Sequence, residues 1–249
     1  MLWSFTLISE KHSFDNCFEV FLADTPESKR IHYHLRYQVY CDELGYEDKE
    51  LFPQQLEFDD WDQHAVHFIV RHRFTGQWLG ALRVVSPQGQ TFPFAEKYEQ
   101  DEPLADAHHR DSIEISRLCV LREARRFAPR SQAAVDADPA SNVKYLNTLR
   151  QQSRSIMWGL YRAAVDYSAE NGIKHWFILV APALAYAVKK QGFDMRQVAE
   201  PCEHRGLRTP YMLDVDHILQ NPLWDEDYQI GYRLYSELEQ GEFAVRQRA

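Results

Sequence analysis

The sequence predicts an α/β protein built on a single mixed, largely antiparallel sheet flanked by helices. Residues 65–73 and 77–85 are two strand patterns separated by a turn, which is typical of an antiparallel hairpin. Residues 112–121 alternate in hydropathy as a further strand does. The helical pattern of residues 145–171 leads into the apolar run 175–180, which favours a buried strand parallel to a neighbour. Strands and helices in this order favour one α/β core.

The first elements are a strand and an amphipathic helix. Residues 14–24 alternate loosely and predict the strand. Thr25 is suited to cap the helix, and Pro26 is suited to its first turn. We expect the helix to run to about Leu44, because Gly45 follows it as a stop signal.

Two loops interrupt the central strands. Residues 42–62 carry nine acidic residues and one basic residue with little periodicity, so we expect a loop there. Residues 87–111 predict a second loop with one helical turn near 94–98. Between these loops, Thr75-Gly76 is the expected turn of the hairpin.

Simple alternation along residues 112–121 predicts two faces of that strand. One face would carry Ile113, Ile115, Arg117, Cys119 and Leu121, and the other would carry Glu114, Ser116, Leu118 and Val120.

The C-terminal part continues with helices and strands after a polar linker, residues 131–144. We expect a helix over 182–191, strands near 194–200 and 208–215, and polar helices around 224–238. The patterns predict one domain, residues 1–216, with residues 217–249 as a helical extension of it.

Composition excludes several classes of protein. The chain has 249 residues and a net charge of −9, which argues against a nucleic-acid partner. No run approaches the roughly 20 apolar residues of a membrane helix, so stable membrane insertion is not expected, and Met1–Ile8 lacks the features of a signal peptide. Four widely spaced cysteines without a CxxC pair predict reduced thiols and a cytoplasmic location.

An acidic cluster follows the first helix, just before the next strand. It contains Glu57, Asp59 and Asp62, and like charges at such a place need cations nearby or a function. Three arginines inside predicted elements could supply the cations: Arg36, Arg83 and Arg117. We therefore predict that all six side chains meet in one polar network beside the sheet.

Several spacings coincide in order along roughly residues 30–215. The motifs are Arg36 with Val39-Tyr40 and Gly45-Tyr46, then Glu57-x-Asp59-x-x-Asp62, Gly80-Ala-Leu-Arg83 and Glu114-Ile-Ser-Arg117. This order resembles the acyl-homoserine lactone synthases, which make autoinducers, and the related N-acyl amino acid synthases. Within that group the resemblance is to the bacterial acyltransferases associated with PEP-CTERM/exosortase sorting systems.

The resemblance implies a GNAT-like acyltransferase fold and a transfer reaction. A fatty acyl group would move from a thioester to the amine of a small acceptor, such as an amino acid or its derivative. The donor would be the acyl-phosphopantetheine of an acyl carrier protein or acyl-CoA, as a co-substrate, with no tightly bound cofactor. The chain lacks the Gly-rich pyrophosphate loop of acetyl-CoA-dependent GNAT enzymes, which favours the carrier protein.

The reaction assigns expected roles to the site residues. Amine attack on a thioester needs a base and stabilisation of an oxyanion. The candidate catalytic residues are Glu57 and Glu114, as alternative bases, and Arg117, as a partner of the acids or a substrate contact. Further members of the expected site are Arg36, Tyr40, Asp59, Asp62, Arg83, Ser116 and Leu118. An apolar tunnel for the acyl chain could use Phe68, Val70, Leu118, Val120, Trp158, Phe177 and Leu179.

A local excess of arginine follows the best strand. We predict that it docks the acidic surface of the acyl carrier protein; a solvated basic loop is the alternative. The residues of this docking patch are Arg122, Arg125, Arg126 and Arg130.

Two other functions compete with acyl transfer. A non-catalytic acyl-lipid-binding module could keep the same fold and pocket. A metal-dependent hydrolase is disfavoured, because the histidines match no known zinc spacing, and we expect no metal site.

Overall fold

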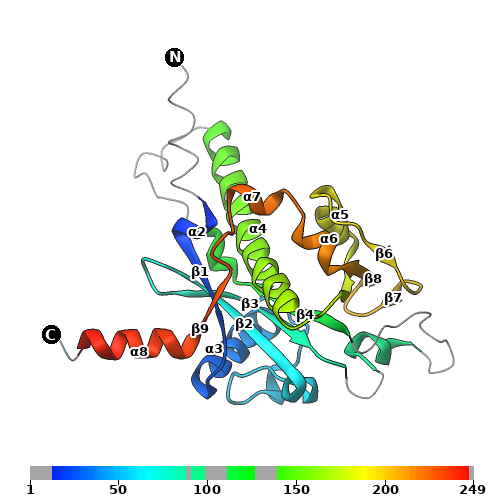
Figure 1. Ribbon diagram of the computed structural model, residues 1–249, viewed down its shortest axis with the longest axis horizontal. Helices are drawn as coiled ribbons and strands as arrows, with labels where there is room; N and C mark the ends of the chain where they lie inside the picture. Colours follow the sequence, from blue (N-terminus) through cyan, green and yellow to red (C-terminus); the bar gives the residue numbers. More distant parts are fainter. Residues whose placement is uncertain (1–12, 88–90, 99–110, 127–138, 247–249) are drawn as a thin grey trace.

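A single mixed sheet organises the protein, as the sequence predicted (Figure 1). The computed structural model describes residues 13–87, 91–98, 111–126 and 139–246, with the backbone alone for 125, 126, 139–154, 226 and 241–246. The strand order is β6-β8-β5-β4-β3-β2-β1-β9, and β7 pairs with β8 off this path. The strands are β1 (Phe18–Leu22), β2 (Ala65–His72), β3 (Trp78–Val85), β4 (Ser112–Val120), β5 (His175–Val180), β6 (Arg196–Gln197), β7 (Cys202–Glu203), β8 (Leu207–Asp214) and β9 (Tyr232–Leu234). Pairing is antiparallel except between β4 and β5 and between β1 and β9.

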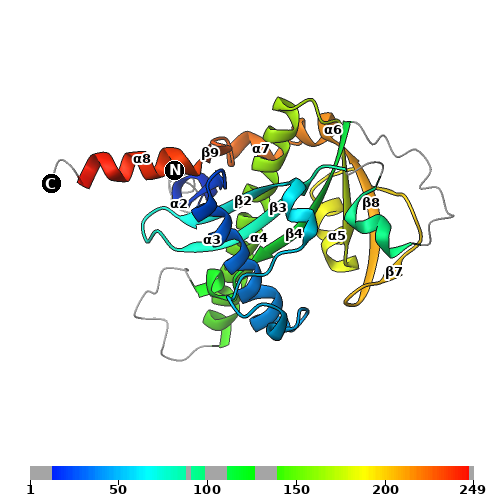
Figure 2. The same cartoon turned by 90° about the horizontal axis from the view of Figure 1, so that it is seen from below.

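Helices cover both faces of the sheet, with α4 on one face and α3 on the other (Figure 1; Figure 2). The longer helices are α3 (Pro26–Tyr37), α4 (Pro139–Glu170), α5 (Pro182–Lys190) and α8 (Tyr235–Arg246). The short ones are α2 (Phe14–Cys17), α6 (Val215–Leu219), α7 (Leu223–Glu226), the π-helix η1 (Gln38–Glu43) and the 3-10 helices η2 (Lys49–Leu51), η3 (Asp60–His64), η4 (Pro93–Lys97) and η6 (Arg122–Arg126). None of the described helices is both long enough and apolar enough to cross a membrane.

Alternate side chains of the strands supply the two halves of the core. In β2, Phe68 and Val70 pack with α4, whereas Ile69 packs with Leu35 of α3. All of these side chains are buried. This period of two is the one that the hydropathy of residues 65–73 predicted.

The central strands β4 and β5 separate partway along their length. They pair in parallel only from Ser112 with His175 to Ile115 with Ile178. Beyond Ile115, β4 remains paired with β3 but no longer with β5. The gap between β4 and β5 therefore opens in the middle of the sheet.

A bulge in β4 overturns the predicted faces of that strand. The register with β3 shifts between the pairs Arg83–Ser116 and Ala81–Cys119, and Arg117 has a left-handed φ of 50°. The extra residue exchanges the faces that follow it, as a bulge does. Leu118 and Val120 consequently join Ile113 and Ile115 on the α4 side, and Cys119 and Leu121 lie on the α3 side.

The structure corrects other expected elements. The predicted strand 14–24 begins with the short helix α2, and the predicted helix to Leu44 ends as the π-helix η1. The region 224–238, where one or two polar helices were expected, holds α7 and the start of α8, but the strand β9 lies between them and pairs with β1 at Val20–Leu22. The sequence did not predict this edge strand, because the region is polar and the strand forms only through its pairing with the distant β1.

Candidate active site

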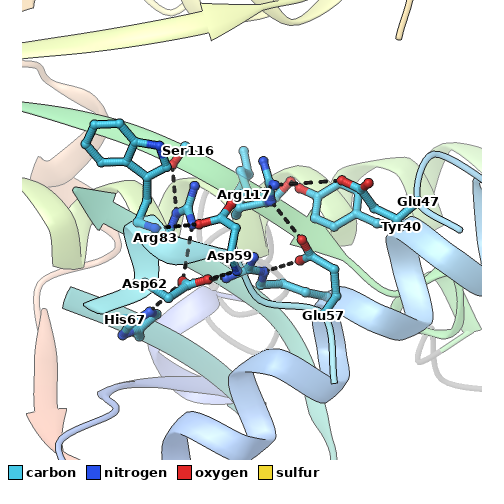
Figure 3. Close-up of polar contacts among 12 residues, drawn as sticks. Tyr40, Glu47, Glu57, Asp59, Asp62, His67, Arg83, Ser116 and Arg117 are labelled. Atoms are coloured by element: carbon cyan, nitrogen blue, oxygen red, sulfur yellow. Dashed lines mark hydrogen bonds and ion pairs between the residues drawn. The ribbon is translucent and has the colours of Figure 1, made fainter. Parts of the chain in front are cut away.

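Three acids and three arginines meet beside β3 and β4 in one network (Figure 3). Arg36 of α3 is fully buried and donates from Nε to Glu57 and from Nη1 to Asp62 Oδ1 at 2.6 Å. Because Arg36 joins two acids that are five residues apart, it fixes the segment that leads into η3. Charge-assisted bonds of this kind add geometric specificity as well as attraction.

The other two arginines complete the network from the sheet. Arg83 Nη1 donates to Asp59 Oδ1 at 2.5 Å, and Arg83 Nε donates to the Ser116 hydroxyl at 3.1 Å. Arg117 Nη2 lies 2.9 Å from Asp59 Oδ2, and its Nε lies 3.3 Å from Glu57 Oε1. The β4 bulge is what allows Arg117 to reach these acids, because it lies outside the regular alternation.

Local hydrogen bonds hold the acids in place. Asp59 caps η3 by accepting from the Trp61 N–H, and Asp62 accepts from the Asp59 N–H at 2.8 Å. His67 also donates from Nε2 to Asp62 Oδ1 at 2.9 Å. Burial acts to raise the pKa of Asp62, but the His67 bond and the charges of Arg36 and Arg83 hold that pKa well below its usual range. Asp62 is therefore an ionised structural partner and not a proton carrier.

A cavity of about 350 Å³ opens where β4 and β5 separate. One side of it is polar and lies near the network: Asp59, Arg83, Glu114, Ser116, Arg117, Glu96 and Lys97 line it. The other side is apolar and belongs to the core beneath α4: Ile115, Leu118, Tyr161, Ile178, Val180 and Leu184 line it. The cavity thus connects the two faces of the sheet through the gap between the strands.

Glu114 is a buried carboxyl group in the lining of the cavity. Its side chain is buried, and Oε2 accepts the Phe94 N–H at 2.9 Å. Burial raises its pKa to about 7, although the Phe94 bond and the charges of Arg83 and Arg117 oppose that rise. A carboxyl group that titrates near neutral pH in a cavity is suited to general acid–base work.

The π-helix η1 brings Tyr40 to the same cavity. The Tyr40 hydroxyl donates to the Leu118 carbonyl at 2.9 Å, and the Arg117 guanidinium lies 5.8 Å from the centre of the Tyr40 ring. Burial raises the pKa of Tyr40, which keeps it neutral. The π-turn therefore ties the end of α3 to the bulged half of β4, a placement often seen at functional sites.

The structure divides the residues predicted from the sequence into three groups. Those that line the cavity are Tyr40, Asp59, Arg83, Glu114, Ser116, Arg117 and Leu118. Three other predicted residues belong to the network but do not line the cavity: Glu57, Arg36 and Asp62. Of the predicted docking residues, Arg122 is exposed and its N–H donates to Glu43, the side chains of Arg125 and Arg126 lie outside the described residues, and so does Arg130.

Residues of the β7–β8 hairpin also surround the cavity, and the sequence did not single them out. His204, Arg205 and Arg208 line it, and Arg205 forms an ion pair with Glu47. Burial and the neighbouring cations, Arg205 first, lower the pKa of His204 to about 4. Only the two closely spaced arginines of residues 205–208 could have suggested this cationic rim.

The tunnel residues predicted from the sequence are only partly at the cavity. Leu118 and Leu179 line it, whereas Phe68 and Val70 are plain core between the sheet and α4. Within the described part of the chain, no group of three or more His, Cys, Asp or Glu side chains is arranged to hold a metal ion.

Comparisons with known proteins identify the fold. Residues 35–133 match the family of acetyltransferase (GNAT) domains. The crystal structure of the AHL synthase LasI has a TM-score of 0.51 at 14% identity, over 80% of this chain and 90% of that chain. The CoA-dependent acyl-homoserine lactone synthase MesI has a TM-score of 0.52 at 15% identity, over 82% of this chain and 92% of that chain.

A third solved structure has a different activity on the same scaffold. FeeM, an N-acyl amino acid synthase from uncultured soil microbes, has a TM-score of 0.50 at 13% identity, over 83% of this chain and 96% of that chain. No curated protein matches the chain by sequence. At these identities the likeness establishes a GNAT-like fold of the acyl-homoserine lactone synthase type.

Proposed function

We propose that the protein is an N-acyltransferase that moves a fatty acyl group from a thioester to the amine of a small acceptor. The observation that carries this proposal is Glu114, a buried carboxyl group with a pKa of about 7, in a cavity that joins a polar side to an apolar side. The apolar side suits an acyl chain, and the polar side suits an amine and its proton transfer.

The proposed reaction is direct aminolysis. The amine nitrogen attacks the thioester carbon, the C–N bond forms, and collapse of the tetrahedral intermediate breaks the C–S bond and releases the thiol of the carrier. Glu114, in its ionised form, accepts the proton that the amine loses, directly or through water. Backbone groups of β4 that turn away from β5 beyond Ile115 are available to the amides of the pantetheine arm and to the oxyanion.

The network around Glu57 has a supporting part in this proposal. Glu57 lies between Arg36 and Arg117 and does not line the cavity, so Glu114 is the better placed of the two candidate bases. Arg117 does line the cavity and can contact the acceptor or the thioester. Arg36 and Asp62 do not line the cavity, and they hold Glu57 and Asp59 in position.

The donor is proposed to be acyl carrier protein, with acyl-CoA as the second candidate. The arginines after β4 favour the carrier protein. Acyl-CoA is kept as a candidate because two solved proteins of the same fold, MesI and BjaI, are CoA-dependent acyl-homoserine lactone synthases. The acceptor class, the cytoplasmic location and the PEP-CTERM resemblance remain predictions from the sequence.

Release of free thiol tests the proposal. The purified protein would be supplied with acyl carrier protein or CoA loaded with fatty acyl groups, together with a panel of amino acids and other small amines, and products would be identified by mass spectrometry. Acceptor-dependent thiol release with a matching N-acyl product supports transfer. Acyl binding without thiol release for any amine would favour the non-catalytic acyl-binding module instead.

A further inference from the structure

The cavity at the site shares a wall with a second, smaller void in the core. This void has a volume of about 10 Å³, about enough for one water molecule. No polar atom faces it, and the stacked rings of Trp158 and Phe193, with centres 5.3 Å apart, form part of its wall. Tyr161 and Ile178 line both spaces, so these two side chains separate the void from the site cavity.

The apolar side of the site cavity leads to this shared wall. Glu114 and Asp59 lie on the polar side, where an amine would be activated. An acyl chain gains about 0.8 kcal/mol for each methylene that it buries, so it points away from those acids and toward Ile115, Val180 and Leu184. Tyr161 and Ile178 are then the side chains that the far end of the chain meets.

The wall is rigid, because both of its members are fixed by neighbours. Tyr161 and Ile178 are 5% and 2% exposed. The Tyr161 ring lies 5.7 Å from that of Trp158 and 6.0 Å from that of Trp176, and Ile178 is paired within the sheet to Ile115 and Tyr211. Close-packed side chains of this kind do not make room for extra methylenes without strain.

We propose that Tyr161 and Ile178 set the length of the acyl chain that the protein accepts, as the closed end of its acyl pocket. The inference rests on the proposed acyl transfer and specifies the substrate of that site. Chains that end at the wall are accepted, and each methylene beyond it lowers kcat/KM by roughly tenfold or more.

The test compares Tyr161→Ala with Tyr161→Phe over straight acyl chains from butanoyl to hexadecanoyl, each supplied both on acyl carrier protein and on CoA. Tyr161→Ala removes the ring and joins the two spaces, so the longest chain accepted becomes longer, with a gain of roughly tenfold or more for the first chain beyond the wild-type limit. Tyr161→Phe is the matched control, because it keeps the aromatic ring that forms the wall and removes only the hydroxyl group. Its limit stays that of the wild type.

A filling variant gives the opposite result and does not open the core. Leu184 lies on the apolar side of the cavity in α5 and is only partly buried. Leu184→Phe shortens the pocket, so the limit moves to shorter chains by a similar factor. If Tyr161→Ala fails to fold, an unchanged limit in Leu184→Phe still overturns the proposal.

Binding of the same thioesters without an acceptor, measured by calorimetry, separates this inference from the proposed function. In one outcome, the longest acyl chain that binds changes in both Tyr161→Ala and Leu184→Phe, but neither the wild type nor a variant turns over. This outcome contradicts acyl transfer and supports Tyr161 and Ile178 as the end of the acyl pocket. If the protein turns over but the longest acyl chain accepted is the same in both variants as in the wild type, the role of Tyr161 and Ile178 is contradicted and acyl transfer is not. The absence of any affinity for acyl thioesters overturns both.

Discussion

Two buried glutamates in the same site have different charged and hydrogen-bonding partners. Glu57 is 1% exposed and Glu114 is 4% exposed, so burial alone does not distinguish them. Glu57 lies between the guanidinium groups of Arg36 and Arg117. The carboxylate of Glu114 has one backbone N–H donor, from Phe94. Its environment favours the protonated form near neutral pH, which is what a base that must release and accept protons requires.

The first prediction concerns the pH dependence of Glu114. Its pKa of about 7 means that kcat/KM rises as pH increases through that value, because only the ionised form accepts the amine proton. Glu114→Gln removes this dependence and lowers kcat by about 10²–10⁴-fold. Activity profiles of both proteins over pH check this. A wild-type profile that is flat through neutral pH contradicts the role.

Stability gives a second readout of the same group. The folded protein keeps the Glu114 proton to about pH 7, whereas the unfolded chain loses it near its ordinary pKa of 4.5. The wild-type free energy of unfolding therefore falls as pH rises through this window, and Glu114→Gln is free of that loss. Urea unfolding at both ends of the window measures the difference.

A buried histidine pair behind the network is a further feature at the residue scale. His32 and His67 are both 0% exposed, and their ring centres lie 4.6 Å apart. Among the described residues, neither ring nitrogen of His32 has a hydrogen-bond partner. Burial first, and then the neighbouring His67 and Arg36, lower the pKa of His32 well below 6.5, so it is neutral in the folded protein.

The second prediction is that this pair makes the protein sensitive to acid. Below pH 6.5 the unfolded chain binds a proton at His32 that the folded protein refuses, so stability is lost as pH falls through that value. His32→Phe removes this loss and raises the free energy of unfolding by about 1–3 kcal/mol under acidic conditions. Denaturant unfolding at acidic and at mildly alkaline pH checks this, with a larger gain expected in acid. An equal gain at both pH values would point to packing alone.

At the scale of elements, the sequence predicted those features that depend on local pattern. The hairpin of β2 and β3 and the apolar strand β5 are visible in hydropathy. The network was found because the clustered acids needed cations, and the arginines inside predicted elements carry the opposite charge. The bulge at Arg117 was missed because a left-handed φ is rare for arginine and leaves no mark in composition. The contribution of the β7–β8 hairpin to the cavity was missed because it depends on how distant segments pack.

The third prediction concerns the edge strand β9. It covers β1, the Tyr232 ring packs 5.3 Å from that of Phe68, and Tyr235 at the start of α8 lies against Phe21 and Trp78. A chain that ends at Gly231 exposes the edge of β1, so we expect it to lose roughly 3–5 kcal/mol of stability and to self-associate. Urea unfolding and size-exclusion chromatography check this. A chain that ends at Gln240 keeps β9 and is the control, expected to behave as the full chain does.

At the scale of the whole molecule, charge is unevenly distributed. The net charge is −9, yet residues 117–130 contain five arginines and one acid. The exposed Arg122 of this stretch lies two residues after the end of β4, and its N–H donates to the carboxylate of Glu43 at the end of η1. The sequence predicts that these arginines attract an acidic carrier, mainly by raising the rate of encounter.

The fourth prediction is that reversing this patch weakens use of the carrier protein. Changing Arg122, Arg125 and Arg126 to Glu raises the apparent KM for acyl carrier protein by about tenfold or more, with little change in kcat, and flattens the dependence on salt. Steady-state kinetics at several ionic strengths measure both effects. Reversal of three exposed bases elsewhere, Lys174, Lys190 and Arg196, is the matched control. Normal use of the carrier by the patch variant, or a strong wild-type preference for acyl-CoA, contradicts the docking role.

The bulge in β4 has a consequence for the deletion of a residue from this strand. If Arg117 is left out, the remaining residues alternate without a break: Ile113, Ile115, Leu118 and Val120 on one face, and Glu114, Ser116, Cys119 and Leu121 on the other. Arg117 is thus one added residue in an otherwise regular strand. Its deletion would leave the register with β3 continuous and every apolar side chain on its present face, while the site would lose an arginine that reaches both Glu57 and Asp59.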